Sequence, residues 1–204
     1  MYSSSPHLVF GFHGCDKEVA DEIISREGIT LRPSENKYDW LGHGIYFWEN
    51  NPKRAKDYAS FVADNPDRGK GKIKKIGVIG AVIDLGYCLN LLESRSLRIV
   101  KQGYDILKSI HEQIGEPLPE NLPVGDDPLL RKLDCAAIET IHAFNKEKKQ
   151  TEYDSVRGVF VEGDKLYPNS GFNERNHIQL CIRNPNCIKG YFHPRKTSES
   201  YPSP

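Results

Sequence analysis

The 204-residue sequence has no excess of either charge, because 28 Lys and Arg residues balance 28 Asp and Glu residues. Without a basic or acidic surplus, nothing global in the chain favours nucleic acid or an anionic membrane as a partner. The N-terminus has no basic segment followed by an apolar run, and no apolar stretch is long enough to span a bilayer. We therefore expect a soluble, unexported, cytoplasmic chain with no membrane partner.

The sequence also lacks a cysteine framework. Its five cysteines are odd in number and irregularly spaced, no CxxC occurs, and each lies beside apolar residues. This pattern excludes a disulfide scaffold and a zinc-ribbon site, so no metal site is predicted. We expect reduced thiols in the core at Cys15, Cys88, Cys135, Cys181 and Cys187.

Four common catalytic or nucleotide-binding motifs are absent. The sequence contains no GxxxxGK[ST] phosphate loop, no GxSxG elbow, no HExxH helix and no GxGxxG fingerprint. The usual signatures of P-loop nucleotidases, serine hydrolases, zinc proteases and dinucleotide-binding folds are thereby missing.

Strand patterns occupy both ends of the chain. Runs rich in β-branched and aromatic residues predict strands at "HLVFGFHG", "ITLRPS", "GHGIYFW", "IGVIGAVIDLG", "SVRGVFVEG", "NHIQLCIR" and "CIKGYFHP". The fourth run is the most apolar and is predicted to be the central strand. Asp16 is the predicted N-cap of a short helix that Gly28 ends, and Pro52 opens a second helix. The inward face of the second helix is predicted to hold Ala55, Tyr58, Ala59 and Val62.

The middle of the chain is helical by periodicity. Apolar residues recur at spacings of three and four from Leu97 to Ile110 and from Leu130 to Phe144. Four prolines between these segments predict an exposed connection, and residues from about 195 to 204 have little to bury and are expected to fray. The chain is therefore predicted to be one α+β domain, residues 1–204, with a helical insertion over about residues 92–150.

The stretch "DWLGHGIYFWENNPKRAKDYA" concentrates aromatic residues and glycines where a strand enters a helix. Together with "FHGC" before it and "NHIQLCIRNPNCIKGYF" after it, this stretch resembles the ADP-ribosyltransferases. The likeness is to the branch with His, Tyr and Glu on three strands, as in the poly(ADP-ribose) polymerases. The three motifs occur in the family's order over about two-thirds of the chain. The resemblance implies a split β-sheet core with NAD as co-substrate.

The resemblance implies a role for each matching residue. His13 would form a hydrogen bond with a ribose hydroxyl of NAD. At Gly14, which has no side chain, the backbone would contact the carboxamide of the nicotinamide. Tyr46 and Tyr58 would stack on the two faces of the nicotinamide ring. Arg54, near a helix start, would meet the pyrophosphate or simply face solvent. The predicted NAD-binding residues are His13, Gly14, Gly44, Tyr46, Arg54 and Tyr58.

The predicted catalytic residues are His13, Tyr46 and Gln179, and the last departs from the family. A Gln at the Glu position accepts a hydrogen bond from the ribose hydroxyl but brings no charge, which argues for a single transfer rather than polymer formation. The base is then the substrate itself, Glu174 or His177. A second departure is Ala55, where the family often has a Ser that binds the carboxamide.

Structural roles are the competing interpretation for several of these residues. Tyr46 and Phe47 would also suit a sheet core, Tyr58 fits the inner face of its helix, and Trp40 and Trp48 are expected to be packing or rim residues. Gln179 is equally compatible with a pocket and with an outward position. The "KGKIKK" run is interpreted as a solvated loop rather than a nucleic-acid contact.

Three functions follow from the resemblance. The first is an NAD-dependent mono-ADP-ribosyltransferase that modifies a protein or nucleic acid, of the kind that serves as a toxin or defence effector with a neutralising partner. The others are an RNA 2′-phosphotransferase-like enzyme and a non-catalytic module that binds NAD or ADP-ribose. Acceptor choice is assigned to the loop "DKLYPNSGFNERN", where Tyr167 or Phe172 would stack on a base or clasp a protein side chain.

Overall fold

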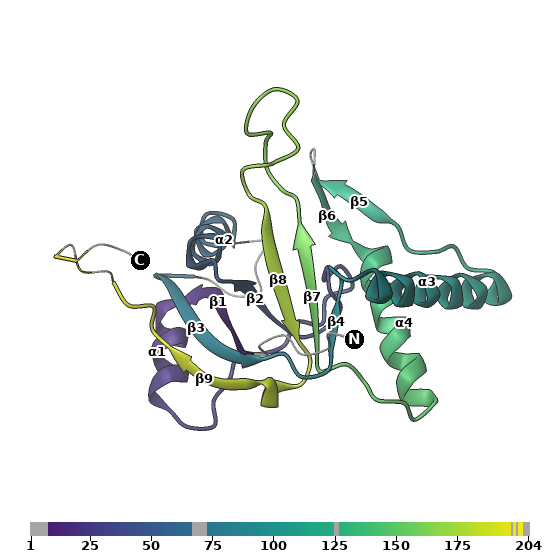
Figure 1. The fold of residues 1–204 in the computed structure, drawn as a ribbon, viewed down its shortest axis with the longest axis horizontal. Coiled ribbons are helices and arrows are strands. Elements are labelled where there is room, and N and C mark those ends of the chain that lie inside the picture. The colour runs from purple at the N-terminus through teal and green to yellow at the C-terminus, as the bar shows by residue number, and fades with distance from the viewer. Residues whose placement is uncertain (1–7, 67–72, 125–126, 197, 199, 202–204) are drawn as a thin grey trace.

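A seven-stranded mixed sheet forms the centre of the protein (Figure 1). The computed structural model describes residues 8–66, 73–124, 127–196, 198, 200 and 201. The strand order is β4-β7-β8-β2-β1-β3-β9, and β5 and β6 form a separate two-stranded sheet. The fold is α+β, as predicted.

The strands are β1 (Leu8–Asp16), β2 (Ile45–Glu49), β3 (Ile76–Asp84), β4 (Cys88–Asn90), β5 (Asn121–Val124), β6 (Asp127–Arg131), β7 (Ser155–Phe160), β8 (His177–Ile182) and β9 (Ile188–Phe192). The helices are α1 (Lys17–Ser25), α2 (Pro52–Asp64), α3 (Ser94–Ile114) and α4 (Lys132–Glu147).

The first two helices begin at side-chain caps. The Asp16 carboxylate accepts the Glu18 amide at 2.9 Å, which confirms the predicted cap of α1. Asn51 caps α2 by accepting the Arg54 amide at 3.0 Å, with Pro52 in the first turn as predicted. Because α2 starts three residues after β2, the cap sets where the helix leaves the sheet.

The sheet opens between β1 and β2. These antiparallel strands pair at Gly11 with Glu49 and at Phe12 with Trp48, whereas β1 pairs with β3 along all nine of its residues. Beyond Phe12 the main-chain ladder between β1 and β2 stops within the described strands. Strands β9, β3 and β1 therefore lie on one side of the opening, and β2, β8, β7 and β4 lie on the other.

Several sequence predictions about the sheet were wrong. Strand β3 is second from an edge rather than central, because β9 alone lies outside it. The segment "ITLRPS" contributes only a bridge from Ser34 to Gly44, since its backbone otherwise follows no ladder. The four-proline connection contains the hairpin of β5 and β6, which its prolines tolerate because both strands are edges. Helix α1 ends at Ser25, before Gly28.

The helical insertion consists of α3 and α4 with the β5–β6 hairpin between them (Figure 1). Both helices overlap the predicted segments, although Leu130, the first residue of the second predicted helix, belongs to β6. They pack closely, because a Cβ at Gly103 of α3 would lie 2.5 Å from the Ile141 side chain of α4. Part of the predicted Gly- and Lys-rich loop, residues 67–72, and part of the predicted frayed tail lie outside the described residues.

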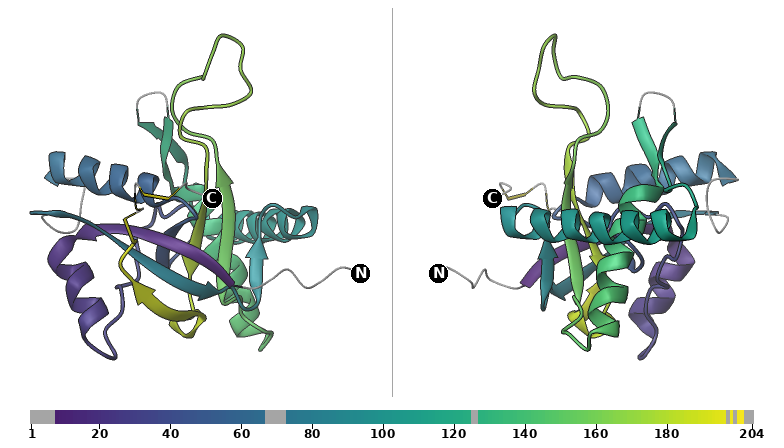
Figure 2. Two further views of the ribbon diagram at one scale, coloured as in Figure 1. Left: turned by 60° about the vertical axis from the view of Figure 1, so that its left-hand side comes forward. Right: turned by 90° about the vertical axis from the view of Figure 1, so that its right-hand side faces the viewer.

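Two hydrophobic clusters lie between the sheet and the helices α1 and α4. The ribbon views show these two helices beside the sheet (Figure 2). One cluster packs Ala20 and Ile23 of α1 against buried residues of β1, β2, β3 and β8. The other packs Ile138 and Ile141 of α4 against β7 and the β8 residue Cys181. All five cysteines are free, and four of them are buried as predicted, whereas Cys88 is only half-buried, so its predicted core position was wrong. Among the described residues, no helix has the length and apolar character needed to cross a bilayer.

His142 of α4 is a buried polar residue whose ring lies 6.0 Å from that of Tyr153, a member of the second cluster. It is 3% exposed, and neither ring nitrogen has a hydrogen-bond partner among the described residues. Burial, reinforced by Arg183 and opposed by Glu139, lowers the pKa of His142 to about 4. The imidazole is therefore neutral in the folded protein at neutral pH.

We expect His142 to make stability fall in acid. Between pH 6.5, its ordinary pKa, and about pH 4, His142 is protonated in the unfolded chain but stays neutral in the folded chain. Folding should thus lose about 3 kcal/mol over that window through this residue. Denaturant unfolding from about pH 7.5 to about pH 4.5 measures the loss, and His142→Leu is the reference that lacks the group. Equal pH slopes for wild type and variant would contradict this expectation.

Candidate functional site

The three predicted catalytic residues lie on adjacent strands beside the opening of the sheet. Gln179 is on β8, Tyr46 on the neighbouring β2, and His13 on β1 across the opening. His13 Nδ1 lies 2.8 Å from the Tyr46 carbonyl oxygen, so it is protonated and donates across the gap. Burial lowers the pKa of His13 despite that bond. The ring is therefore neutral and its Nε2 is an acceptor.

The two predicted glycines are required by packing. A Cβ at Gly14 would lie 2.0 Å from the Ala55 carbonyl oxygen, because α2 rests directly on β1 there. A Cβ at Gly44 would lie 2.6 Å from Cys181 Sγ and 2.7 Å from the Ile182 carbonyl oxygen. Protein atoms thus occupy the space that each missing side chain leaves, and contact of either backbone with a ligand remains a prediction.

The Tyr46 hydroxyl is held by the preceding loop. It donates to the Gly42 carbonyl at 2.6 Å and accepts the Leu41 amide at 2.9 Å. Burial raises the pKa of Tyr46 well above its ordinary value, so the phenol stays neutral. Because the hydroxyl is held both as a donor and as an acceptor, the ring of the half-buried Tyr46 has a fixed orientation.

A clamp from the helical insertion holds that loop in turn. Glu139 of α4 accepts the His43 amide at 2.8 Å, and Arg183, just after β8, donates to the His43 carbonyl at 2.9 Å and to Glu139 at 2.5 Å. Although burial acts in the other direction, the bonds from Arg183 and His43 hold the pKa of Glu139 below its ordinary value. The insertion, which had no assigned role at the sequence level, therefore braces the loop over Tyr46.

Replacing Glu139 by Ala should destabilise the fold by about 1–3 kcal/mol, because it strips Arg183 and the His43 amide of their shared acceptor. The drop in the denaturant midpoint measures this effect. Glu112→Ala on α3 is the matched control. Its carboxylate meets Lys108 at 3.6 Å in an exposed pair, so its loss should cost no more than about 0.5 kcal/mol. Equal midpoints for the two variants would show that the clamp carries no stability.

Tyr58 differs from its predicted placement, whereas Trp48 is a packing residue as predicted. Tyr58 is 43% exposed rather than buried on the inner face of α2, because the buried face there consists of Ala55, Ala59 and Val62. Trp48 is only 5% exposed, and its ring centroid lies 5.1 Å from that of Tyr58. Tyr58 thus contacts Trp48, and among the described residues no ring contact joins it to Tyr46.

A polar chain runs from Gln179 to the end of β7. Gln179 Nε2 lies 3.1 Å from His177 Nε2, and His177 Nδ1 lies 2.7 Å from the Arg175 carbonyl. Because the carbonyl requires a proton on Nδ1, Nε2 is the acceptor and the Gln179 amide is the donor. His177 is buried, and this burial lowers its pKa even though the Arg175 carbonyl acts in the opposite direction.

Arg54 joins this chain through Glu162. The two side chains meet at 2.9 Å and are 14% and 12% exposed, and the Glu162 carboxylate lies 3.7 Å from His177 Nδ1. Arg54 is therefore partnered by a carboxylate, which competes with the pyrophosphate contact suggested by the sequence. Glu162 was missed, and its signal was an acidic residue two positions after the end of the apolar strand "SVRGVF".

The loop between β7 and β8 projects from the sheet at the same end as the β5–β6 hairpin (Figure 1). Its aromatic residues Tyr167 and Phe172 are 57% and 61% exposed. Glu174, the second base suggested by the sequence, is exposed on this loop, whereas His177 is buried beside Gln179. Of the two, only His177 is joined to Gln179 by a hydrogen bond.

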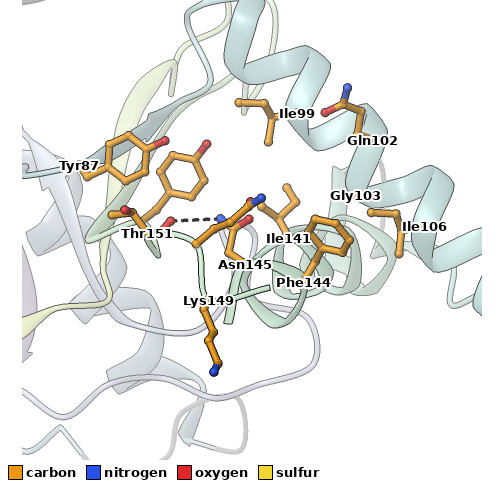
Figure 3. A pocket seen from close by; sticks show the side chains of 12 residues that line it. Tyr87, Ile99, Gln102, Gly103, Ile106, Ile141, Phe144, Asn145, Lys149 and Thr151 are labelled. Atoms are coloured by element: carbon orange, nitrogen blue, oxygen red, sulfur yellow. Dashed lines mark hydrogen bonds between the residues drawn. The ribbon is translucent and has the colours of Figure 1, made fainter. Parts of the chain in front are cut away.

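A cavity of about 530 Å³ lies elsewhere, between α3, α4 and the stacked pair of Tyr87 and Tyr153 (Figure 3). Its walls are mostly apolar and amide side chains from α3 and α4, and no predicted site residue lines it. A smaller cavity of about 350 Å³ is lined by His43, Gly44 and Arg183. Among the described residues, no group of three or more His, Cys, Asp or Glu is placed to hold a metal ion. We therefore take the β1–β2 opening with its polar chain as the candidate site.

Comparison with known proteins provides one relative and no assigned chemistry. No protein-family model matches the sequence, and no solved structure matches it. The chain is 27% identical over 195 residues to a protein of Methanocaldococcus jannaschii described as uncharacterized protein MJ0359, covering 87% of this chain and 83% of the relative. This similarity extends over nearly the whole chain, the insertion included.

Proposed function

We propose that this protein is an NAD-dependent mono-ADP-ribosyltransferase that transfers ADP-ribose to a macromolecular acceptor. The observation that carries the proposal is the juxtaposition of His13, Tyr46 and Gln179 on adjacent strands at the opening of the sheet. These residues come from motifs that are 33 and 133 positions apart in the chain, since 46 − 13 = 33 and 179 − 46 = 133. A shared pocket is the simplest reason for their common location.

In the proposed reaction, the bond between the nicotinamide nitrogen and the anomeric carbon breaks, and the acceptor nucleophile bonds to that carbon as nicotinamide leaves. His13 Nε2 would accept a ribose hydroxyl, because its Nδ1 is committed to the Tyr46 carbonyl. The Tyr46 ring, fixed by Leu41 and Gly42, would support one face of the nicotinamide. Holding the ring and the ribose separately orients the bond that breaks.

The charge in the site favours slow, single transfers. The transition state develops positive charge on the ribose and is stabilised by negative charge beneath it. Gln179 offers only a carbonyl dipole, and the Glu162 carboxylate is neutralised by Arg54. We therefore propose a mono-transferase rather than a polymerase.

His177 is the proposed general base. Its imidazole is neutral because burial lowers its pKa, and its Nε2 lone pair is held by the Gln179 amide, which a nucleophile can replace. The proton lost by the acceptor would pass to this nitrogen. Glu174 is less suitable because it lies on the exposed loop.

A second candidate is a non-catalytic module that binds NAD or ADP-ribose, and the absence of charge at Gln179 is the observation that favours it. The RNA 2′-phosphotransferase alternative calls for several cationic contacts, whereas Arg54 of this site is already paired with Glu162. A role as a toxin or defence effector held by a neutralising partner is part of the family analogy.

The test uses the purified full chain, NAD labelled on its adenylate half, and cell extract, followed by protease or nuclease. Label on a macromolecule supports the transferase, with loss to protease indicating a protein acceptor and loss to nuclease a nucleic acid. Lys108→Ala, an exposed change on α3, is the matched control and should label as wild type does. Binding of NAD without consumption would favour the non-catalytic module, and no binding at all would overturn both proposals.

A further inference from the structure

The indole N–H of Trp48 is an unused hydrogen-bond donor inside the candidate site. Trp48 is 5% exposed, and its Nε1 has no hydrogen-bond partner among the described residues. A buried indole N–H normally finds an acceptor, because leaving it unpaired costs about 1–3 kcal/mol. A donor left in this state beside predicted catalytic residues suggests that a ligand supplies the acceptor.

The surroundings of Trp48 place that donor next to Gln179. Trp48 and Gln179 are direct cross-strand partners on β2 and β8. Directly opposed residues share one face of an antiparallel pair, with Cβ atoms about 4.5–5.5 Å apart. The Trp48 ring also lies 5.1 Å from the ring of Tyr58 and 6.3 Å from that of His177, which limits its movement.

Gln179 presents the complementary group. Its Nε2 donates to His177 Nε2 at 3.1 Å, because that ring nitrogen carries the lone pair. The amide orientation is thereby set, and Oε1 is left as an acceptor. One donor and one acceptor from opposed residues thus lie on the same face of the sheet.

A hydroxyl group matches this pair. It donates one proton and accepts through two lone pairs, so a single oxygen satisfies Gln179 Oε1 and Trp48 Nε1 together. A phosphate oxygen or a carbonyl would meet Trp48 but repel Gln179 Oε1, and an ammonium would leave the indole unpaired. We infer that Trp48 and Gln179 form a hydroxyl-binding pair that recognises a ribose of the bound dinucleotide, with Trp48 as the donor.

This inference rests on the proposed function and adds a specificity residue to it. It predicts that the site discriminates ribose from deoxyribose at the hydroxyl next to the anomeric carbon. It also explains how Gln179 positions the sugar without charge, because the indole fixes the same oxygen from a second direction.

The test uses the two tryptophans of the chain as reporters. The ¹⁵N-labelled protein gives one indole signal each for Trp40 and Trp48, and Trp40→Phe assigns them. The probe is a carbocyclic NAD analogue, which resists cleavage, with and without the 2′-hydroxyl of the nicotinamide-bearing ring. We expect the Trp48 indole proton to move downfield with the hydroxylated probe and not with the deoxy probe.

Calorimetric binding provides a second readout. Trp48→Phe keeps an aromatic ring but lacks the donor, so it should bind the hydroxylated probe about tenfold more weakly and lose its preference over the deoxy probe. Trp40→Phe, whose ring lies 4.4 Å from that of Phe160, is the matched control and should keep wild-type affinity.

The outcomes separate this inference from the function beneath it. If wild type binds the probe while the Trp48 signal stays still, or responds equally to the deoxy probe, the hydroxyl-binding pair is overturned and the transferase proposal stands. If wild type binds neither probe, both are overturned. Because the indole measurement needs no change at Trp48, a misfolded Trp48→Phe protein does not prevent a decision.

Discussion

Gly14→Ala should destabilise the protein by about 3 kcal/mol or more, which corresponds to a fall in Tm of roughly 6–12 °C for a chain of this size. The added methyl would lie 2.0 Å from the Ala55 carbonyl oxygen and 3.0 Å from Ala59 Cβ. Relief requires the first turns of α2 to move away from β1, because the nearest atom is backbone rather than a flexible side chain. That movement would also shift Arg54 and Tyr58, so binding of NAD should weaken with the fold.

The matched control for Gly14→Ala is Gly190→Ala on β9. A Cβ at Gly190 would meet no atom within 4 Å, so this change should leave Tm nearly unaltered. Calorimetric unfolding of both variants makes the comparison. A Gly14→Ala protein as stable as wild type would mean that α2 does not rest on β1 as closely as described.

Gln179→Glu should raise the rate of NAD consumption roughly tenfold or more, and Gln179→Ala should lower it by roughly a hundredfold. The carboxylate would supply the negative charge that the transition state lacks beneath the ribose, whereas Ala removes the acceptor altogether. Initial rates of nicotinamide release by the three proteins, at saturating NAD, measure the effect. Because misfolding lowers the rate in either variant, a rate that rises with Glu and falls with Ala at position 179 would show an effect on the reaction itself.

The matched control for Gln179→Glu is Gln102→Glu, which introduces the same charge on α3 at the distant cavity. It should leave the rate unchanged. If Gln179→Glu also leaves the rate unchanged, Gln179 does not stand where the transition state forms, and the placement of the third motif is wrong.

Local patterns were sufficient for much of the fold. The cap at Asp16, the start of α2 at Pro52 and the two long helices of the insertion depend on residues close in sequence, and the structure has all of them. The hairpin of β5 and β6 was missed because the four prolines between the two long helices outweighed any strand pattern. The position of β3, second from an edge, was missed because apolar content reports burial, and a strand covered by helices is buried at any place in the order.

For the candidate site, too, some features could be predicted from the sequence and others could not. The motifs in the sequence pointed to His13, Tyr46 and Gln179, and the structure has these residues on adjacent strands, whereas their chemical roles stay a prediction. Only the tertiary structure decided their partners. The Glu139 clamp over Tyr46 joins residues 96 positions apart, and the Arg54 pair with Glu162 spans 108.

Trp48 illustrates why the contacts of the site residues could not be predicted from the sequence. Its sequence position predicted a packing or rim residue, and strand alternation does not reveal whether an indole nitrogen meets an acceptor. That depends on β8 pairing with β2 and on Tyr58 and His177 approaching from α2 and the end of the β7–β8 loop. The sequence by itself thus determined the fold class, the starts of α1 and α2 and the presence of the two long helices, because these follow from residue type and local spacing. The opening of the sheet, the clamp and the unpaired indole were decided by long-range strand pairing, which no local pattern encodes.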